Sequence, residues 1–192
     1  MQYYWKIPFI SRAIYSIWKI DAQRKYSMCQ DWITPDQKLL EIGSGPGSII
    51  EIFRGHGHDV QGLDIADNSI SPNLKPDIYD GETMPYADKH FDVSLLLTVL
   101  HHVPQPDDIL REAMRISRRI IIIEDVYDTP FQAAYTKLTD SITNLEFIGH
   151  PHSNRSDAEW RATFERFGWT LRHHKIYPLA KLFQQAIYVV EP

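Results

Sequence analysis

Three glycines at alternate positions are the strongest chemical signal in the sequence. They lie in Glu41-Ile42-Gly43-Ser44-Gly45-Pro46-Gly47, where a short apolar strand gives way to a helix. Glycines at such a turn let backbone N–H groups approach a ligand without a Cβ in the way. In α/β sheets, ligands bind just beyond the carboxyl ends of the strands. The loop therefore predicts a ligand site here, although an ordinary glycine-rich turn has the same composition.

An acidic residue, Asp64, ends the second predicted strand, 64 − 47 = 17 residues after the last glycine of the loop. A carboxylate at this place faces the same crevice as the loop. It can accept hydrogen bonds from both ribose hydroxyls of an adenosine, and it repels a 2′-phosphate. Asp64 also suits a turn or a helix N-cap, but its combination with the glycine loop favours adenosine binding.

Two other nucleotide-binding loops do not fit the spacing. The dinucleotide fingerprint needs its third glycine one position later, where this chain has Ser48. A Walker loop needs a Lys-Ser or Lys-Thr pair after the glycines, and none follows. The loop thus argues against a pyrophosphate cradle.

Alternating strands and helices must position these residues. Strands are predicted at Lys38–Ile42, Asp59–Leu63, Asp77–Tyr79, Phe91–Leu97 and Ile120–Glu124, helices at Ser48–Arg54, Asp107–Arg115 and from Ser156-Asp157 to Phe167, and a closing hairpin at Trp169–Tyr177 and Gln184–Val190 with Pro178 in its turn. The alternation predicts an α/β fold with a parallel sheet covered by helices. The hairpin predicts one antiparallel strand at the sheet edge.

Composition limits the class of protein. A chain of 192 residues with 43% hydrophobic content can bury the core of one domain, and its net charge of −5 gives no broad basic field for nucleic acid. The single cysteine, Cys29, fits a reducing compartment, so we expect a cytoplasmic protein. The aromatic N-terminus is interrupted by charges, and no apolar run is long enough for a transmembrane segment.

The first 34 residues predict a helix with one apolar stripe. The stripe comprises Ile10, Ala13, Ile14, Ile17 and Trp18. This helix packs on the domain or over its site, or else it presents a lipid-contacting surface.

Together, these motifs resemble class I S-adenosylmethionine-dependent methyltransferases, most closely the branch called methyltransferase type 11. The resemblance covers about residues 35–125. It includes the glycine loop, Gly62-Leu63-Asp64-Ile65, the stretch Asp80–Tyr86, and Leu97–Val103 with the helix after it. It implies a Rossmann-like sheet of order 3-2-1-4-5-7-6 with strand seven antiparallel, S-adenosylmethionine as cofactor, and methyl transfer to an unidentified, small-molecule acceptor.

The resemblance also assigns cofactor-binding roles. It implies that the methionine moiety is surrounded by Glu41, Gly43, Ser44, Gly45 and Gly47, the ribose is held by Asp64, adenine contacts Ile65, Asp80 and Gly81, and the methionine amino group is bordered by Leu97 and Thr98. Two departures are visible. Ile116–Arg119 replaces the usual loop before strand five and predicts a tighter, more basic one. Ala66–Pro76 is too short for the usual helix.

Several residues suit chemistry on the acceptor. His101 and His102 follow strand four, and we take His102 as the candidate general base, although both imidazoles can also simply shape the pocket. Asp125, Tyr127 and Asp128 are placed just past strand five. Within one domain, 1–192, we therefore expect an N-terminal segment at 1–34, a cofactor core at 35–125, a lid or acceptor insert at 126–155, with Phe131–His152 at its centre, and a closing unit at 156–192.

Other functions are less well supported by the residues. His150, His152, His173 and His174 lack metal-ligand spacing, so no metal site is predicted. The arginines at 111, 115, 118 and 119 suit a solvated face better than an RNA-binding patch. A non-catalytic S-adenosylmethionine-binding subunit and a NAD-dependent oxidoreductase remain as alternatives. The sequence leaves the oligomeric state and the acceptor open.

Overall fold

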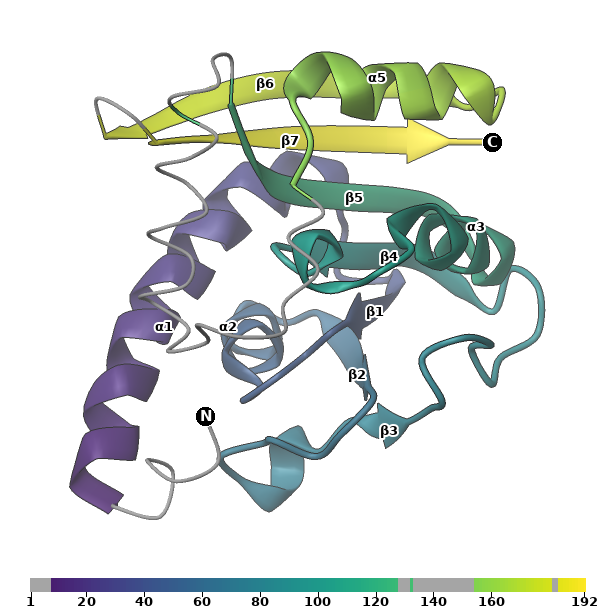
Figure 1. The fold of residues 1–192 in the computed structure, drawn as a ribbon. Coiled ribbons are helices and arrows are strands. Elements are labelled where there is room, and N and C mark those ends of the chain that lie inside the picture. Colours follow the sequence, from purple (N-terminus) through teal and green to yellow (C-terminus); the bar gives the residue numbers. More distant parts are fainter. Residues whose placement is uncertain (1–7, 128–131, 133–153, 181–182) are drawn as a thin grey trace.

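A seven-stranded sheet forms the centre of the molecule (Figure 1). The computed structural model describes residues 8–127, 132, 154–180 and 183–192. Its strands are β1 Lys38–Ile42, β2 Asp59–Asp64, β3 Asp77–Ile78, β4 Phe91–Leu97, β5 Ser117–Val126, β6 Thr170–Ala180 and β7 Phe183–Glu191. They lie in the order β3-β2-β1-β4-β5-β7-β6, parallel except for β7, which is antiparallel to both neighbours. The strand order that the resemblance implied is confirmed.

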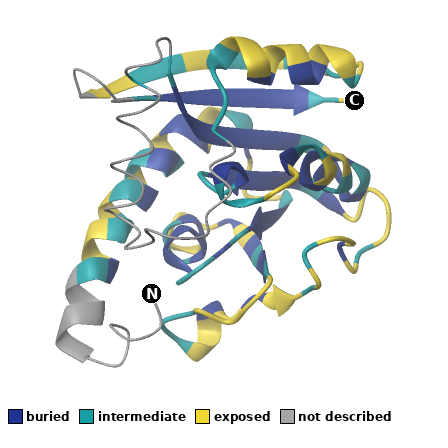
Figure 2. Ribbon diagram, viewed as in Figure 1, coloured by how far each residue is buried: buried dark blue, intermediate teal, exposed yellow. Residues whose placement is uncertain are grey.

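Helices cover both faces of the sheet. They are α1 Pro8–Cys29, α2 Ser48–Gly55, α3 Pro106–Ile116 and α5 Asp157–Arg166, with short 3-10 helices η2 Gln30–Trp32, η3 Pro72–Leu74 and η4 Leu100–His102. One buried cluster contains side chains of α1 and α2, and a second contains side chains of α3 and α5. Figure 2 shows the central strands buried between these layers. This is the three-layer arrangement of an open α/β sheet.

The isoleucine run of β5 shows how the sequence builds both layers. Side chains alternate across a strand. Ile120 and Ile122 therefore belong to the cluster under α3 and α5, while Ile121 and Ile123 belong to the cluster under α1 and α2. A strand buried on both faces needs this unbroken apolar sequence.

Local signals set the ends of α5. The Ser156 hydroxyl accepts a hydrogen bond from Glu159 N, and the Glu159 carboxylate accepts one from Ser156 N, which together form a capping box. Gly168 follows the helix at φ +71°. Both ends lie where the sequence predicted them.

The predicted apolar stripe of α1 is wrong at Ile17, whose side chain is 64% exposed. The helix instead buries Tyr15, Ala22 and Cys29, which are seven residues apart and so lie on one face. The buried face also carries Lys25, 6% exposed, whose ammonium contacts the Thr98 hydroxyl and the Asp21 carboxylate.

Two further predictions are corrected in the second half of the sheet. Ile116–Arg119 is not a loop, because α3 ends at Ile116 and β5 begins at Ser117, which pairs with Phe91. Pro178 does not lie in the hairpin turn; it lies within β6 opposite Gln184, beside a register shift. Proline is tolerated there because β6 is the edge strand. Between β2 and β3 the chain has only η3, as the short, proline-containing segment indicated.

Candidate active site

The glycine loop and Asp64 meet at the carboxyl ends of β1 and β2. Gly43 N donates to Leu63 O at 2.8 Å, and Gly45 N donates to Asp64 Oδ2 at 2.8 Å. The other carboxylate oxygen, Oδ1, accepts a hydrogen bond from Ile65 N at 2.7 Å. The carboxylate therefore fixes the loop as well as lying at the expected ribose position.

Glycine is required at the three loop positions for different structural reasons. All three have positive φ: +75° at Gly43, +50° at Gly45 and +87° at Gly47. A Cβ on Gly43 would lie 2.2 Å from Val99 Cγ2, and one on Gly47 would lie 2.7 Å from Leu74 Cβ. Nothing lies within 4 Å of a Cβ on Gly45. The outer glycines permit close packing, and the central one has open space on the side where a Cβ would project.

Two buried polar groups beside this loop have no hydrogen-bond partner among the residues that the structure describes. They are Glu41 Oε2 and Ser44 Oγ. Burial raises the pKa of Glu41 well above its usual value; Lys25 opposes this shift and the Asp64 carboxylate adds to it. Unsatisfied buried polar groups are costly, and a polar ligand relieves that cost. Their presence fits the methionyl end of the expected cofactor.

The residues expected around adenine lie next along the sheet edge. Ile65 is 65% exposed, which leaves an apolar surface for a ring to cover. A Cβ on Gly81, at φ +87°, would be 3.4 Å from Ile65 Cγ2. Backbone N–H groups of Glu82 and Thr83 hold the pKa of Asp80 below its usual value. Asp80 is thus an ionised acceptor close to an apolar platform.

Thr98, the first residue after β4, has a strained backbone. Its φ is +64°, a conformation that β-branched residues rarely adopt. The Thr98 backbone N–H donates to Ile123 O at 2.7 Å, and its hydroxyl donates to Leu97 O at 2.6 Å. Strain of this kind is concentrated at functional sites.

The two histidines have different surroundings. His101 is 4% exposed, and its Nδ1 lies 2.7 Å from Glu124 Oε2. The other oxygen of Glu124 accepts backbone N–H bonds from Val99 and Leu100 at 2.8 and 2.7 Å, so this pair fixes the turn after β4. The His102 ring is only partly buried and lies 4.0 Å from the His101 ring, between centroids. His102 is therefore the histidine of the two that is more accessible to a substrate.

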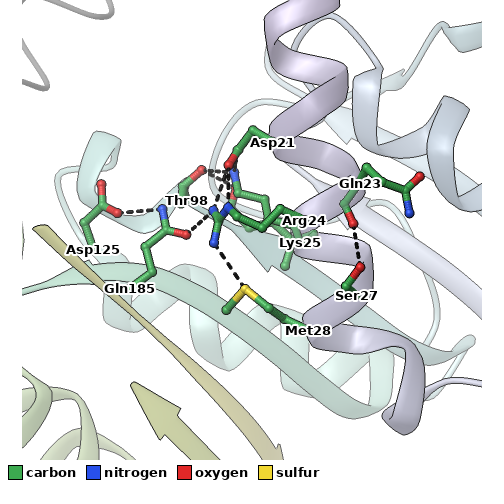
Figure 3. A network of polar contacts seen from close by, with 10 residues as sticks. Asp21, Gln23, Arg24, Lys25, Ser27, Met28, Thr98, Asp125 and Gln185 are labelled. Atoms are coloured by element: carbon green, nitrogen blue, oxygen red, sulfur yellow. Dashed lines mark hydrogen bonds and ion pairs between the residues drawn. The ribbon is translucent and has the colours of Figure 1, made fainter. Parts of the chain in front are cut away.

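Sequence reasoning missed a polar network that joins α1 to the site (Figure 3). Asp21 of α1 pairs with both Arg24 and Lys25 of the same helix. Lys25 also donates to the Thr98 hydroxyl, and Arg24 donates to Gln185. Gln185 Nε2 in turn donates to Asp125 Oδ1 at 2.7 Å. The i, i+4 spacing of Asp21 and Lys25 is visible in the sequence, but it usually marks a surface pair. Nothing in the spacing indicates that the lysine of this pair is buried.

Asp125 lies within β5 and not past its end, which corrects its expected position. Burial raises its pKa to about 6, against the opposing hydrogen bond from Gln185. The Tyr127 hydroxyl donates to Asn154 O at 3.2 Å. Asp128 and the expected insert Phe131–His152, apart from Gln132, lie outside the described residues.

Comparison with known proteins identifies a family whose sequence pattern this chain matches. Residues 40–123 match the family model described as a methyltransferase domain, of type 11. This match covers less than half of the chain, and it supports the resemblance to class I S-adenosylmethionine-dependent methyltransferases. S-adenosylmethionine is therefore the cofactor of this domain, and the orphaned Glu41 and Ser44 atoms fit it.

Relatives of this methyltransferase domain include enzymes of quinone synthesis. A demethylmenaquinone methyltransferase of Renibacterium salmoninarum is 28% identical over 54% of this chain and 48% of its own length. A ubiquinone/menaquinone biosynthesis C-methyltransferase of Roseobacter denitrificans is 29% identical over 60% and 51%. The chain spans about half the length of these curated relatives. A solved methyltransferase of Methanosarcina mazei has a TM-score of 0.67 at 18% identity, covering 86% of this chain and 97% of that one.

Other candidate sites on the methyltransferase domain receive no support. Each of the four arginines at 111, 115, 118 and 119 forms an ion pair with a carboxylate. Within the described ranges, no three His, Cys, Asp or Glu side chains are grouped to hold a metal. The same residues include no helix long and apolar enough to cross a membrane.

Asp64→Ala should weaken binding of S-adenosylhomocysteine by about tenfold or more, because charge-assisted hydrogen bonds are lost and the loop tether at Gly45 is removed. Asp64→Asn keeps one acceptor oxygen and should cost less. Isothermal calorimetry measures both. Asp67→Ala is the matched control, since Asp67 makes a similar turn contact with Ser69 outside the expected site. Unchanged affinity in folded Asp64→Ala would remove Asp64 from the site.

Asp125→Asn should raise the unfolding free energy near pH 8. The folded-state pKa of Asp125, about 6, exceeds its ordinary value, so the folded protein binds the proton more tightly. Wild type therefore loses stability as the pH rises from about 4 to about 6, and Asn removes this loss. Denaturant titrations measure the unfolding free energy of both proteins. The advantage of Asp125→Asn over wild type should increase by an amount on the order of 2 kcal/mol between pH 4 and pH 8. A pH-independent difference would contradict it.

Proposed function

We propose that this chain transfers a methyl group from S-adenosylmethionine to a small-molecule acceptor. The observation that carries the proposal is the hydrogen bond from Gly45 N to Asp64 Oδ2. It brings the glycine loop next to the carboxylate that is expected to bind the ribose. The family of residues 40–123 supports the same reaction.

Cofactor binding is divided among the ends of four strands. Glu41, Ser44 and the glycine loop suit the methionyl end, with Leu97 O and the Thr98 hydroxyl as acceptors for its ammonium group. Asp64 accepts hydrogen bonds from the ribose. At the adenine end, Ile65 packs against the ring, while Asp80 accepts from the exocyclic amine beside Gly81.

When bound, the cofactor supplies a methyl group already activated on a sulfonium. The protein therefore needs no covalent intermediate, and its task is to align the acceptor with that methyl group and to exclude water. His102, the last residue of η4, is the proposed group that accepts a proton from the acceptor. The His101–Glu124 pair holds the turn before His102, because Glu124 also accepts hydrogen bonds from the backbone N–H groups of Val99 and Leu100.

For the acceptor, we infer a quinone-type ring that is methylated on carbon. The support comes from the relatives, which are named for demethylmenaquinone and for C-methylation in ubiquinone and menaquinone biosynthesis. Methylation on carbon requires loss of a proton from the acceptor, and that requirement suits a nearby imidazole.

The direct test combines binding with turnover. Calorimetry should show binding of S-adenosylmethionine and S-adenosylhomocysteine and no appreciable binding of NAD. Protein incubated with isotopically labelled S-adenosylmethionine and a demethylated quinol, or with native extract, should yield a labelled product by mass spectrometry. Cofactor binding without any labelled product would favour a non-catalytic subunit. Tight binding of NAD alone would favour an oxidoreductase and overturn the proposal.

His102→Ala should lower the turnover rate by about a hundredfold or more and leave the affinity for S-adenosylhomocysteine nearly intact. An imidazole base must be neutral to act, so the fall of the rate at acidic pH should also disappear in the variant. Single-turnover rates across a pH series measure both effects. His90→Ala, an exposed histidine before β4, is the control and should keep its rate. A normal rate and pH profile in His102→Ala would make His102 a pocket wall.

A further inference from the structure

Lys25 of α1 places a primary ammonium at the end of β4 (Figure 3). Lys25 Nζ lies 2.7 Å from Thr98 Oγ1, 3.4 Å from Leu97 O and 2.8 Å from Asp21 Oδ2. Lys25 as a whole is only 6% exposed to solvent. The positive charge of Lys25 also counteracts the rise in the pKa of Glu41 that burial causes. One helix outside the family match thus reaches the residues at the methionyl end of the site.

Two of these contacts coincide with acceptors in the proposed cofactor site. Leu97 O and Thr98 Oγ1 are the groups proposed to border the cofactor's ammonium, and here an ammonium of the same chemistry already contacts them. Two like charges cannot share these acceptors without repulsion. Cofactor binding therefore requires Lys25 to change its partner.

The geometry points to Lys25 as the residue that binds the carboxylate of the cofactor's methionyl group. This inference rests on the proposed function. The incoming group carries an ammonium and a carboxylate on one carbon, so the ammonium takes the acceptors of β4 as the carboxylate arrives beside Lys25. Lys25 then exchanges its two contacts at β4 for a charge-assisted bond and keeps its ion pair with Asp21.

The contacts of Lys25 make this exchange feasible. Its bond to Leu97 O is long, at 3.4 Å, and is the weakest of the three. The lysine side chain has a flexible four-carbon stem with rotatable donors. Asp21 lies on the same helix one turn away, so the ion pair restrains the stem without fixing the ammonium on β4.

The neighbouring cationic side chains on α1 have other partners. The Arg24 guanidinium bonds Asp21 and Gln185, and Lys19 pairs with Glu51 of α2. Lys25, by contrast, contacts both Leu97 and Thr98. Lys25 is accordingly the better candidate to neutralise a carboxylate at this place.

The test is a thermodynamic cycle that combines substitution of Lys25 with removal of the carboxylate from the ligand. The ligands are S-adenosylhomocysteine and S-adenosyl-3-thiopropylamine, which keeps the amine and thioether but lacks the carboxylate. Wild type should bind S-adenosylhomocysteine about tenfold or more tightly than the decarboxylated ligand. In Lys25→Met this ratio should fall to within about twofold, because only the carboxylate-bearing ligand loses a partner. Calorimetry gives all four dissociation constants.

Two further variants secure the interpretation. Lys19→Met removes a charge from the same helix and should keep the wild-type ratio, because Lys19 pairs with Glu51 away from β4. Lys25→Gln keeps a donor without the charge, and it replaces Lys25→Met if the latter does not fold; its ratio should also fall.

The outcomes separate this inference from the proposed function. An equal ratio in wild type and both Lys25 variants would show that Lys25 does not bind the carboxylate. Tighter binding of both ligands by the variants would make Lys25 a competitor of the cofactor's ammonium, which also overturns the inference. Failure of wild type to bind either ligand would instead overturn the proposed function.

Discussion

Two backbone donors of the glycine loop join the end of β1 to the end of β2, and the proposed site depends on this junction. Gly43 N reaches Leu63 O, and Gly45 N reaches the Asp64 carboxylate. β1 lies between β2 and β4, where the strand order reverses, and α/β sheets bind ligands at that point. Because one carboxylate orients the loop and lies at the ribose position, the loop conformation and the acid act as one unit.

Strand β5 distributes two acidic side chains to opposite faces of the sheet. Glu124 follows the parity of Ile122 and faces the α3 and α5 layer, where it binds His101 and the turn after β4. Asp125 has the opposite parity and meets Gln185, which Arg24 of α1 holds. The period of two in a strand thus separates a carboxylate that fixes the histidine turn from one that connects to the N-terminal helix.

The buried charge of Lys25 on α1 requires an explanation, because an unpaired buried ion is strongly destabilising. Lys25 and Arg24 are both paired with Asp21, and each has a further polar partner at the carboxyl edge of the sheet. These directional contacts favour one register of α1 on the sheet, whereas its apolar contacts alone are less specific. The family match begins at residue 40, so α1 lies outside it and contributes these contacts from there.

The sequence by itself determined the strand–helix order, the glycine loop, the acid at Asp64 and the helix start at Ser156-Asp157, because each depends on neighbours close in the chain. It also indicated the family through several motifs in order. Tertiary structure decided which face of α1 is buried, which left Ile17 exposed, and it made Ser117 part of β5. It also brought Lys25 to Leu97 and Thr98, more than seventy residues away. Helical periodicity records that a helix has an apolar face, but pairing with distant groups decides whether a charged residue can lie within it.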